Sequence, residues 1–309
     1  MATTRRALQS PSSGPAGFRL MGIVNVTPDS FSDGGRFAAP GAAIEHGLEL
    51  VADGAAIVDV GGESTRPGSE PVTAEVETAR ALPVVEGLAA TGTDAQISID
   101  TRKASVARAA LVAGATLVND VSALRDPEMA GVVAESGADC CLMHMLGEPR
   151  TMQDDPRYDD VVDYVKAFLA ARLEHAVREG VREERVLLDP GIGFGKRDED
   201  NLALIRRLDE IVALGRPVVI GTSRKGFIGR VGGAGAGADR LAGTLATNVL
   251  ALERGASVFR VHDVAPAREA LAVAAATLAS RWTASSTATT PTSSTTTRAG
   301  TTTSTPQRR

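Results

Sequence analysis

The segment SVFRVHDVA places an arginine and a histidine at alternate positions of an apolar run. Such a run predicts a buried strand, and alternate residues of a strand share one face, so Arg260 and His262 would point the same way. A cationic arginine and a histidine on one face are suited to binding an anion such as a phosphate. Thr65 beside Arg66 offers a second pair of donors for a phosphate or a carboxylate.

Polar residues also end the other short apolar runs of the chain. Eight runs stop at a residue that donates or accepts hydrogen bonds, namely Asn25, Asp59, Asp100, Asn119, His144, Asp189, Ser223 and His262. If the runs are strands of a barrel, we expect all eight ends to converge on one pocket, because the carboxyl ends of barrel strands form one mouth. The alternative is that these residues only cap the helices that follow. The recurrence of acidic, amide and basic residues at strand ends favours the pocket.

The elements that would position these side chains alternate along the chain. The apolar runs are FRLMGIVNV, AAIVDVGG, QISIDT, TLVNDVS, CCLMHM, RVLLDPG, PVVIGTS and SVFRVHD, and longer Ala/Leu-rich amphipathic segments separate them. This βαβα pattern is typical of a parallel sheet. Eight similar units favour a single (β/α)8 TIM barrel, with its active site at the C-terminal ends of the strands, over an open doubly wound sheet.

The length of the chain predicts one large domain. Its 309 residues are 43% hydrophobic, enough to bury a full core, and barrels of this size are usually single domains. We expect a flexible N-terminal segment over residues 1–17, the barrel over 18–282 and a disordered tail over 283–309. In that tail, 17 of 27 residues are Ser or Thr, so burial cannot offset the entropy of ordering it.

Composition argues against several classes of function. The net charge of -5 and the pI near 5.5 disfavour a nucleic-acid or anionic-membrane partner, both of which require a basic face. We find neither a secretory signal nor an apolar segment of roughly 18 residues, the length of a membrane helix. Cys140 and Cys141 are adjacent, which predicts small core residues in a reducing cytoplasm. The four histidines are widely separated, which disfavours a zinc site.

Two polar loops carry the most specific pattern of the sequence. The segments NVTPDSFSDGG (25–35) and GGESTRPGSEP (61–71) are rich in Gly, Pro and Ser, so we expect neither helix nor strand. Long loops at a barrel mouth usually act as lids or binding loops. With SIDT, VNDVS, LMHM, LDPGIGFGK, GTSRK and FRVHDV following in that order, the chain from Phe18 to about Ala279 resembles the dihydropteroate synthases of the pterin-binding barrel family.

This resemblance implies a transferase of folate biosynthesis. Members of the family condense p-aminobenzoate with 6-hydroxymethyl-7,8-dihydropterin diphosphate, which gives 7,8-dihydropteroate and pyrophosphate. The resemblance also implies Mg²⁺ as cofactor, sulfonamides as competitive inhibitors, and a homodimer built on late helices such as the one expected over 240–255.

Residue roles follow from the resemblance by matching motif. The pterin would be held by Asp100, Asn119, Asp189 and Lys225, with Met143 and Phe194 as walls for the flat ring. The diphosphate would be held by Asn25 with Mg²⁺, Thr65, Arg66, Arg260 and His262. The p-aminobenzoate site would be lined by Thr65, Pro67, Ser223 and the stem of Lys225. The catalytic set would be Asp100, Asp189, Lys225 and Arg260.

The residue types suit this chemistry independently. One edge of a pterin carries N–H groups that donate hydrogen bonds. Carboxylates accept such hydrogen bonds, and an Asn amide can both donate and accept them. Departure of a diphosphate requires a metal ion and fixed cations to stabilise the growing negative charge. If the bond to the leaving diphosphate breaks first, a cationic dihydropterin methylene forms, and nearby carboxylates would stabilise this cation. The neutral aromatic amine would then attack the methylene, and no general base is obviously required.

Four other interpretations stay open at this point, two for Lys225 and two for the whole protein. Lys225 could be a surface residue after its strand, or a Schiff-base lysine as in barrel aldolases. A methyltransferase on the same barrel would keep the pterin-binding Asp and Asn but would not need the two polar loops. A non-catalytic paralogue would be expected to degenerate first in those loops and in RVHDV, and all of these segments are intact.

Overall fold

The computed structural model describes residues 17–27, 40–233 and 239–279, and these residues belong to one compact unit that ends at Ala279. The strands are β1 (Arg19–Asn25), β2 (Ile57–Gly61), β3 (Gln96–Asp100), β4 (Leu117–Asp120), β5 (Asp139–Met143), β6 (Val186–Asp189), β7 (Val219–Ile220) and β8 (Val258–Val261). The helices are α1 (Pro40–Ala52), α2 (Ala74–Ala90), α3 (Ala104–Ala113), α4 (Met129–Ser136), α5 (Val161–Arg178), η1 (Glu183–Arg185), α6 (Asp198–Arg206), α7 (Leu208–Val212), α8 (Gly226–Val231), α9 (Leu241–Glu253) and α10 (Val264–Ala279).

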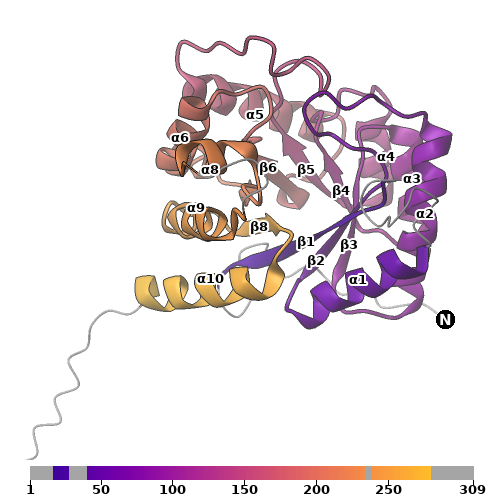
Figure 1. Cartoon of the computed structure of the whole chain (residues 1–309). Coiled ribbons are helices and arrows are strands. Elements are labelled where there is room, and N and C mark those ends of the chain that lie inside the picture. The colour runs from indigo at the N-terminus through magenta and orange to yellow at the C-terminus, as the bar shows by residue number, and fades with distance from the viewer. Residues whose placement is uncertain (1–16, 28–39, 234–238, 280–309) are drawn as a thin grey trace, which may run out of the picture. The chain divides into compact units, whose positions relative to one another are not determined.

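The eight strands of the described residues form one parallel sheet in the order β6-β5-β4-β3-β2-β1-β8-β7. Between its two outer strands, the backbone N–H of Leu188 donates to the carbonyl of Pro217 at 2.9 Å, and Leu188 also bridges to Val218 in parallel. The sheet is therefore nearly closed into a barrel, with helices outside the strands (Figure 1). The predicted TIM barrel is confirmed, and the open doubly wound sheet is wrong.

Alternate strand residues face two different cores. One apolar layer inside the barrel consists of Met21, Ile57, Leu117, Cys141, Leu187, Val219 and Val258. The intervening residues, including Val58, Cys140 and Phe259, belong to the larger core between strands and helices. The adjacent cysteines thus lie on opposite faces of β5, as the period of two requires. The same period aims residues 59, 100, 119, 189 and 260 along the inner face of the barrel.

Two helices after the strands start at capping residues that lie within the loops. The hydroxyl of Thr73 accepts from the N–H of Val76 at the start of α2, and the carboxylate of Asp160 accepts from Val162 at the start of α5. Capping of these helices therefore does not use Asp59 or His144, the polar residues at the ends of β2 and β5.

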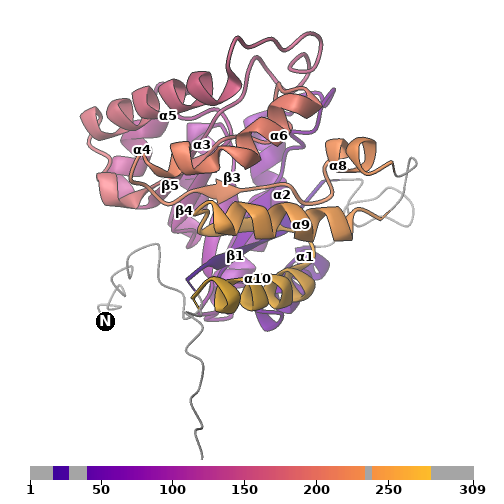
Figure 2. The ribbon, with the colours of Figure 1, turned by 90° about the vertical axis from the view of Figure 1, so that its left-hand side faces the viewer.

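Helices α9 and α10 lie side by side on the outside of the barrel (Figures 1 and 2). No helix in the described ranges combines the length and the apolarity needed to cross a lipid bilayer. The segment predicted to be flexible lies, apart from Gly17, outside the described residues. The predicted tail 283–309 and residues 28–35 of the first polar loop lie outside them as well.

Replacement of Leu117 by Ala should leave a cavity inside the barrel, because Leu117 is fully buried in the inner apolar layer. We expect a loss of about 2–5 kcal/mol in the free energy of unfolding. Val112→Ala is the control, since Val112 is 87% exposed, and it should change stability by no more than about 0.5 kcal/mol. Urea denaturation measures both values, and equal effects would contradict the assignment of Leu117 to the inner layer.

Candidate active site

A cavity of about 1190 Å³ opens at the carboxyl ends of the strands. Every residue predicted for the site lines it: Asn25, Thr65, Arg66, Pro67, Asp100, Asn119, Met143, Asp189, Phe194, Ser223, Lys225, Arg260 and His262. These residues come from most of the strands and from the loops that follow them, as expected for a TIM-barrel site.

Two of the eight strand-end residues do not line the cavity, so the expectation that all eight converge there is wrong. The side chain of Asp59 is fully buried and accepts hydrogen bonds from Arg260 and Asn119, both of which line the cavity. His144 follows Met143, which lines the cavity, and so faces the opposite side of the strand. There it packs against aromatic rings, with its ring centroid 4.9 Å from that of Phe168.

A buried ionic network forms the floor of the cavity. Arg260 donates from Nε to Asp59 Oδ2 and from Nη2 to Asp100 Oδ2, each at 2.7 Å. Asn119 Nδ2 donates to the same oxygen of Asp59 at 2.9 Å, and Ser98 Oγ donates to Oδ1 at 2.5 Å. These five side chains come from β2, β3, β4 and β8, which lie on one stretch of the sheet in the order β4-β3-β2-β1-β8, so strand pairing brings them together.

The network sets one guanidinium against two buried carboxylates. Burial raises the pKa of Asp100 to about 7; the charge of Arg260 opposes the shift, and the carboxylate of Asp59 adds to it. Burial lowers the pKa of Arg260, but the charges of Asp59 and Asp100 outweigh that effect and raise it above its usual value. Arg260 is therefore a fixed cation, whereas Asp100 can gain or lose a proton near neutral pH.

A second part of the cavity is formed by Asp189, Lys225 and Phe194. The ammonium of Lys225 lies 4.6 Å from the centre of the Phe194 ring and also donates to the carbonyl of Ile192. Burial lowers the pKa of Lys225 to about 8, and the carboxylate of Asp189 limits that shift. Lys225 therefore points into the mouth and is not the surface residue that an isolated SRK tripeptide would suggest.

The loop that carries Phe194 is held by several hydrogen bonds and by glycine geometry. Asp189 Oδ1 accepts from the N–H of Gly191 at 2.7 Å, and the phenol of Tyr158 donates to the carbonyl of Gly195 at 2.6 Å. Gly191 has φ +67°, and a Cβ there would lie 1.9 Å from the carbonyl oxygen of His144. A residue with a side chain cannot occupy this position without displacing the loop.

Sequence reasoning gave no role to Lys196, which helps to hold the same loop. Its ammonium lies 2.8 Å from Nδ1 of His144 and donates to the carbonyl of Phe194 at 3.0 Å. Burial and the nearby charge of Lys225 lower the pKa of Lys196 well below its usual value. No motif identified this contact, since the two side chains are 52 positions apart.

His262 and Ser223 form a neutral hydrogen-bonding pair. Ser223 Oγ accepts from the backbone N–H of His262 at 3.2 Å and lies 3.0 Å from Nδ1 of the ring. Burial and the charges of Arg260 and Arg224 lower the pKa of His262 to about 4, so its ring is neutral at pH 7. In the tautomer in which the serine hydroxyl donates to Nδ1, the ring proton resides on Nε2. The fixed positive charge of the pair predicted in RVHDV is thus supplied by Arg260.

Thr65, Arg66 and Pro67 lie in the loop after β2, at the rim of the cavity. Arg66 and Pro67 are exposed, whereas Thr65 is partly buried. The structure therefore brings this loop to the strand-end residues, as the sequence predicts for a binding loop. Asn25 ends β1 and lines the same cavity.

The amide oxygen of Asn25 is the candidate ligand for Mg²⁺ in the cavity. No group of three or more His, Cys, Asp or Glu side chains arranged to hold a metal occurs within the described residues. Mg²⁺ often keeps several waters and binds through one or two protein oxygens together with substrate phosphates. A single amide oxygen beside the Arg260 and His262 end of the cavity fits that mode of binding.

Fold and cavity together define a pterin-binding enzyme of the TIM-barrel class. A family model described as "Pterin binding enzyme" matches residues 21–262. The dihydropteroate synthase of Escherichia coli (strain K12) is 44% identical over 262 residues, which cover 85% of this chain and 92% of that protein. The chain belongs to the dihydropteroate synthase family.

Solved structures agree with this assignment. The Xanthomonas albilineans dihydropteroate synthase with 4-aminobenzoic acid has a TM-score of 0.80 and 48% identity, covering 85% of this chain and 93% of that one. The Yersinia pestis dihydropteroate synthase in a sulfonamide drug complex has a TM-score of 0.82 and 38% identity, covering 91% of this chain and 99% of that one.

Gly191→Ala should destabilise the protein more than a matched change elsewhere. Gly92 has nearly the same φ, +69°, but a Cβ there meets nothing within 4 Å, so Gly92→Ala isolates the cost of the left-handed backbone, about 1–2 kcal/mol. The added clash at residue 191 should increase the loss of unfolding free energy beyond that of Gly92→Ala. Thermal and urea unfolding of both variants test this expectation, and equal losses would contradict it.

Proposed function

We propose that this chain is a dihydropteroate synthase that condenses p-aminobenzoate with 6-hydroxymethyl-7,8-dihydropterin diphosphate and releases pyrophosphate. One observation carries the proposal: a single cavity combines carboxylates and an amide at its base with a fixed guanidinium and a neutral imidazole beside them. A substrate that joins a heterocycle with an N–H edge to an anionic leaving group needs hydrogen-bond acceptors for the heterocycle and a cation for the leaving group in the same cavity. The protein is accordingly a transferase of folate biosynthesis, which agrees with the family to which it belongs.

In this proposal the pterin binds at the base of the cavity. Asp100 and Asp189 accept hydrogen bonds from its donor edge, and Asn119 both donates and accepts. The Nζ of Lys225 lies 4.6 Å from the centre of the Phe194 ring, and together with Met143 these side chains would form the walls around the flat pterin ring. Asp59 would not contact the pterin itself; it accepts hydrogen bonds from Asn119 and Arg260 and so orients both side chains.

The diphosphate would bind at Arg260, His262, Thr65, Arg66 and Asn25. Asp59 and Asp100 use Nε and Nη2 of Arg260, which leaves its Nη1 donors for an oxyanion. The Nε2–H of His262 would supply a neutral donor beside it. The residues at this end fit Mg²⁺ held through Asn25, and the ion, when bound, supplies Lewis-acid stabilisation of the leaving group.

Thr65, Pro67, Ser223 and the stem of Lys225 would form the p-aminobenzoate site at the rim. We favour a dissociative path in which the bond to the leaving group breaks first. Arg260 would then stabilise the departing charge, and Asp100 and Asp189 the cationic methylene, before the neutral amine attacks. A heavy-atom isotope effect at the methylene carbon typical of concerted displacement would contradict this path.

Three further features belong to the proposal. Sulfonamides would act as competitive inhibitors, since a solved relative binds such a drug. The free, buried cysteines suit a reducing cytoplasm. A homodimer would use α9 and α10, where Leu250, Val273 and Leu278 are exposed, and sedimentation at micromolar concentration tests it. A monomer would exclude the dimer.

The experiment that tests the activity is pyrophosphate release with Mg²⁺ and the dihydropterin diphosphate, with and without p-aminobenzoate. We expect release that depends on p-aminobenzoate and that falls by on the order of 10²-fold or more in Arg260→Ala, because the fixed cation at the leaving group is lost. Circular dichroism checks that the variant is folded. Binding of the pterin without turnover in the wild type would instead indicate a pterin-binding paralogue.

Pterin binding should depend on pH through Asp100. The raised pKa of about 7 means that Asp100 gains a proton as pH falls, and a protonated carboxyl loses acceptor capacity for the donor edge of the pterin. If only the ionised form binds, the Kd of the pterin should rise about tenfold for each pH unit below 7. Titration calorimetry between pH 5.5 and 8 measures this slope. In Asp100→Asn the slope should disappear; a slope that persists would assign the proton to another group.

A further inference from the structure

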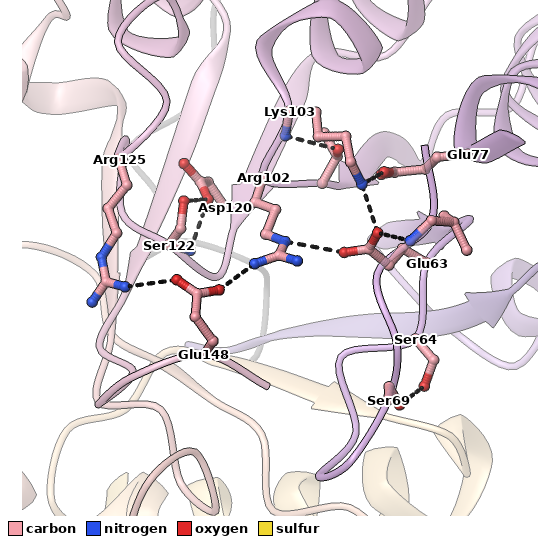
Figure 3. Close-up of polar contacts among 12 residues, drawn as sticks. Glu63, Ser64, Ser69, Glu77, Arg102, Lys103, Asp120, Ser122, Arg125 and Glu148 are labelled. Carbon is pink, nitrogen blue, oxygen red and sulfur yellow. Dashed lines mark hydrogen bonds and ion pairs between the residues drawn. The ribbon is translucent and has the colours of Figure 1, made fainter. Parts of the chain in front are cut away.

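Six charged residues form a continuous chain of ion pairs at the rim of the barrel, which we call the rim network (Figure 3). Acids and bases alternate along it, in the order Glu77, Lys103, Glu63, Arg102, Glu148 and Arg125. The network joins the start of α2 to the loops that follow β2, β3, β4 and β5. No role in the reaction proposed above uses any of these residues.

Glu63 is the central member of the rim network and is nearly inaccessible, with 5% of its side chain exposed. Oε2 accepts from Lys103 Nζ at 2.6 Å, and Oε1 accepts from Arg102 Nε at 3.0 Å. Burial raises the pKa of Glu63, but the hydrogen bonds and charges of its partners outweigh burial and hold it below the usual value. Glu63 is thus an anion at neutral pH, fixed between two cations.

The two cations are fixed on their other sides as well. Lys103 Nζ also donates to Glu77 Oε2 at 2.5 Å, and the side chain of Glu77 is only 1% exposed. Arg102 donates from Nη1 to Glu148. The other oxygen of Glu148 lies 3.4 Å from Arg125 Nη1, and Arg125 donates to the backbone carbonyl of residue 145 at 3.1 Å. The position of Glu63 is therefore determined from both directions.

Glu63 also closes the loop in which it lies. Its Oε2 accepts from the backbone N–H of Val72 at 2.9 Å, which joins the two ends of the segment 63–72. Within that segment, the hydroxyls of Ser64 and Ser69 lie 2.9 Å apart, and the N–H of Gly68 donates to the carbonyl of Pro149 at 3.0 Å. Thr65, Arg66 and Pro67 lie inside both closures.

From this geometry we infer that Glu63 is a positioning residue for the Thr65–Pro67 segment, and that the affinity for the aromatic amine substrate depends on it. The inference rests on the proposed function, which assigns Thr65 and Pro67 to p-aminobenzoate. Among the described residues no hydrogen bond or ion pair joins Glu63 to Asp100, Asn119 or Asp189, so pterin binding should depend little on Glu63. The network acts on Asp100 through the charge of Glu77, which contributes to the raised pKa of Asp100. Small displacements of a positioned group can change catalysis by large factors.

Glu63→Gln tests the inference because it keeps the shape of the side chain and removes its charge. We expect the KM for p-aminobenzoate to rise at least tenfold, kcat to fall less than threefold, and the Kd of the dihydropterin diphosphate to change less than twofold. Glu135→Gln is the matched control: it removes an equivalent charge from an exposed 3.4 Å pair with Arg108, and all three constants should stay at wild-type values. Urea unfolding verifies that each variant is folded.

A second pair of variants keeps the inference testable if Glu63→Gln folds poorly. Glu148→Gln removes the exposed outer link of the rim network and should raise the same KM by two- to fivefold. The double variant with Arg102→Gln and Glu148→Gln should raise the KM for p-aminobenzoate by a factor smaller than the product of the factors measured for the two single variants. Both changes break the same ion pair between Arg102 and Glu148, so their effects are not independent.

The outcomes separate this inference from the proposed function. A wild-type KM in Glu63→Gln and Glu148→Gln would overturn the inference alone. A parallel change in the KM for p-aminobenzoate and the Kd of the pterin would also overturn it, because the effect would then extend to the whole site. Absence of aminobenzoate-dependent pyrophosphate release in the wild-type protein would overturn the proposed function itself.

Discussion

Arg260 donates to Asp59 and to Asp100 at 2.7 Å each, and this buried arrangement of one cation and two anions constrains the rest of the site. Burial of any one of these charges without its partners would cost several kcal/mol. Arg260 on β8 and Asp59 on β2 are 201 positions apart in the sequence, and they meet only because both strands pair with β1. Parallel pairing through β1 is thus required for the site as well as for the core.

The rim is organised by different forces from those below it. Around the strands the packing is apolar, and inside the barrel one apolar layer supports the buried charges. At the rim, loops too rich in Gly, Pro and Ser to bury much apolar surface are held by ion pairs and backbone hydrogen bonds, as in the segment 63–72. Apolar packing therefore fixes the strand ends, while partly buried charges fix the loops.

The sequence was sufficient for the barrel and for most of the site because both depend on short-range patterns. Strand length, the period of two and polar strand ends predict where residues 100, 119, 189 and 260 lie. The same period also accounts for the error at His144, since Met143 already occupies the inner face. The rim network could not be predicted, because Glu63 and Arg102 are 39 positions apart, Arg102 and Glu148 are 46 apart, and their meeting depends on loop geometry.

Arg260 lies between the residues proposed for the two halves of the dihydropterin substrate, and this position couples them. Its Nη2 donates to Asp100, a proposed pterin ligand, and neither of its carboxylate contacts uses Nη1. Negative charge at the proposed diphosphate end would raise the pKa of Asp100, whereas positive charge on the methylene would lower it. The opposite charges of the leaving group and the methylene would therefore act on the same Arg260–Asp100 ion pair. A neutral side chain at 260 could bind neither half in this way, which accounts for a partly buried arginine in a strand otherwise made of apolar residues.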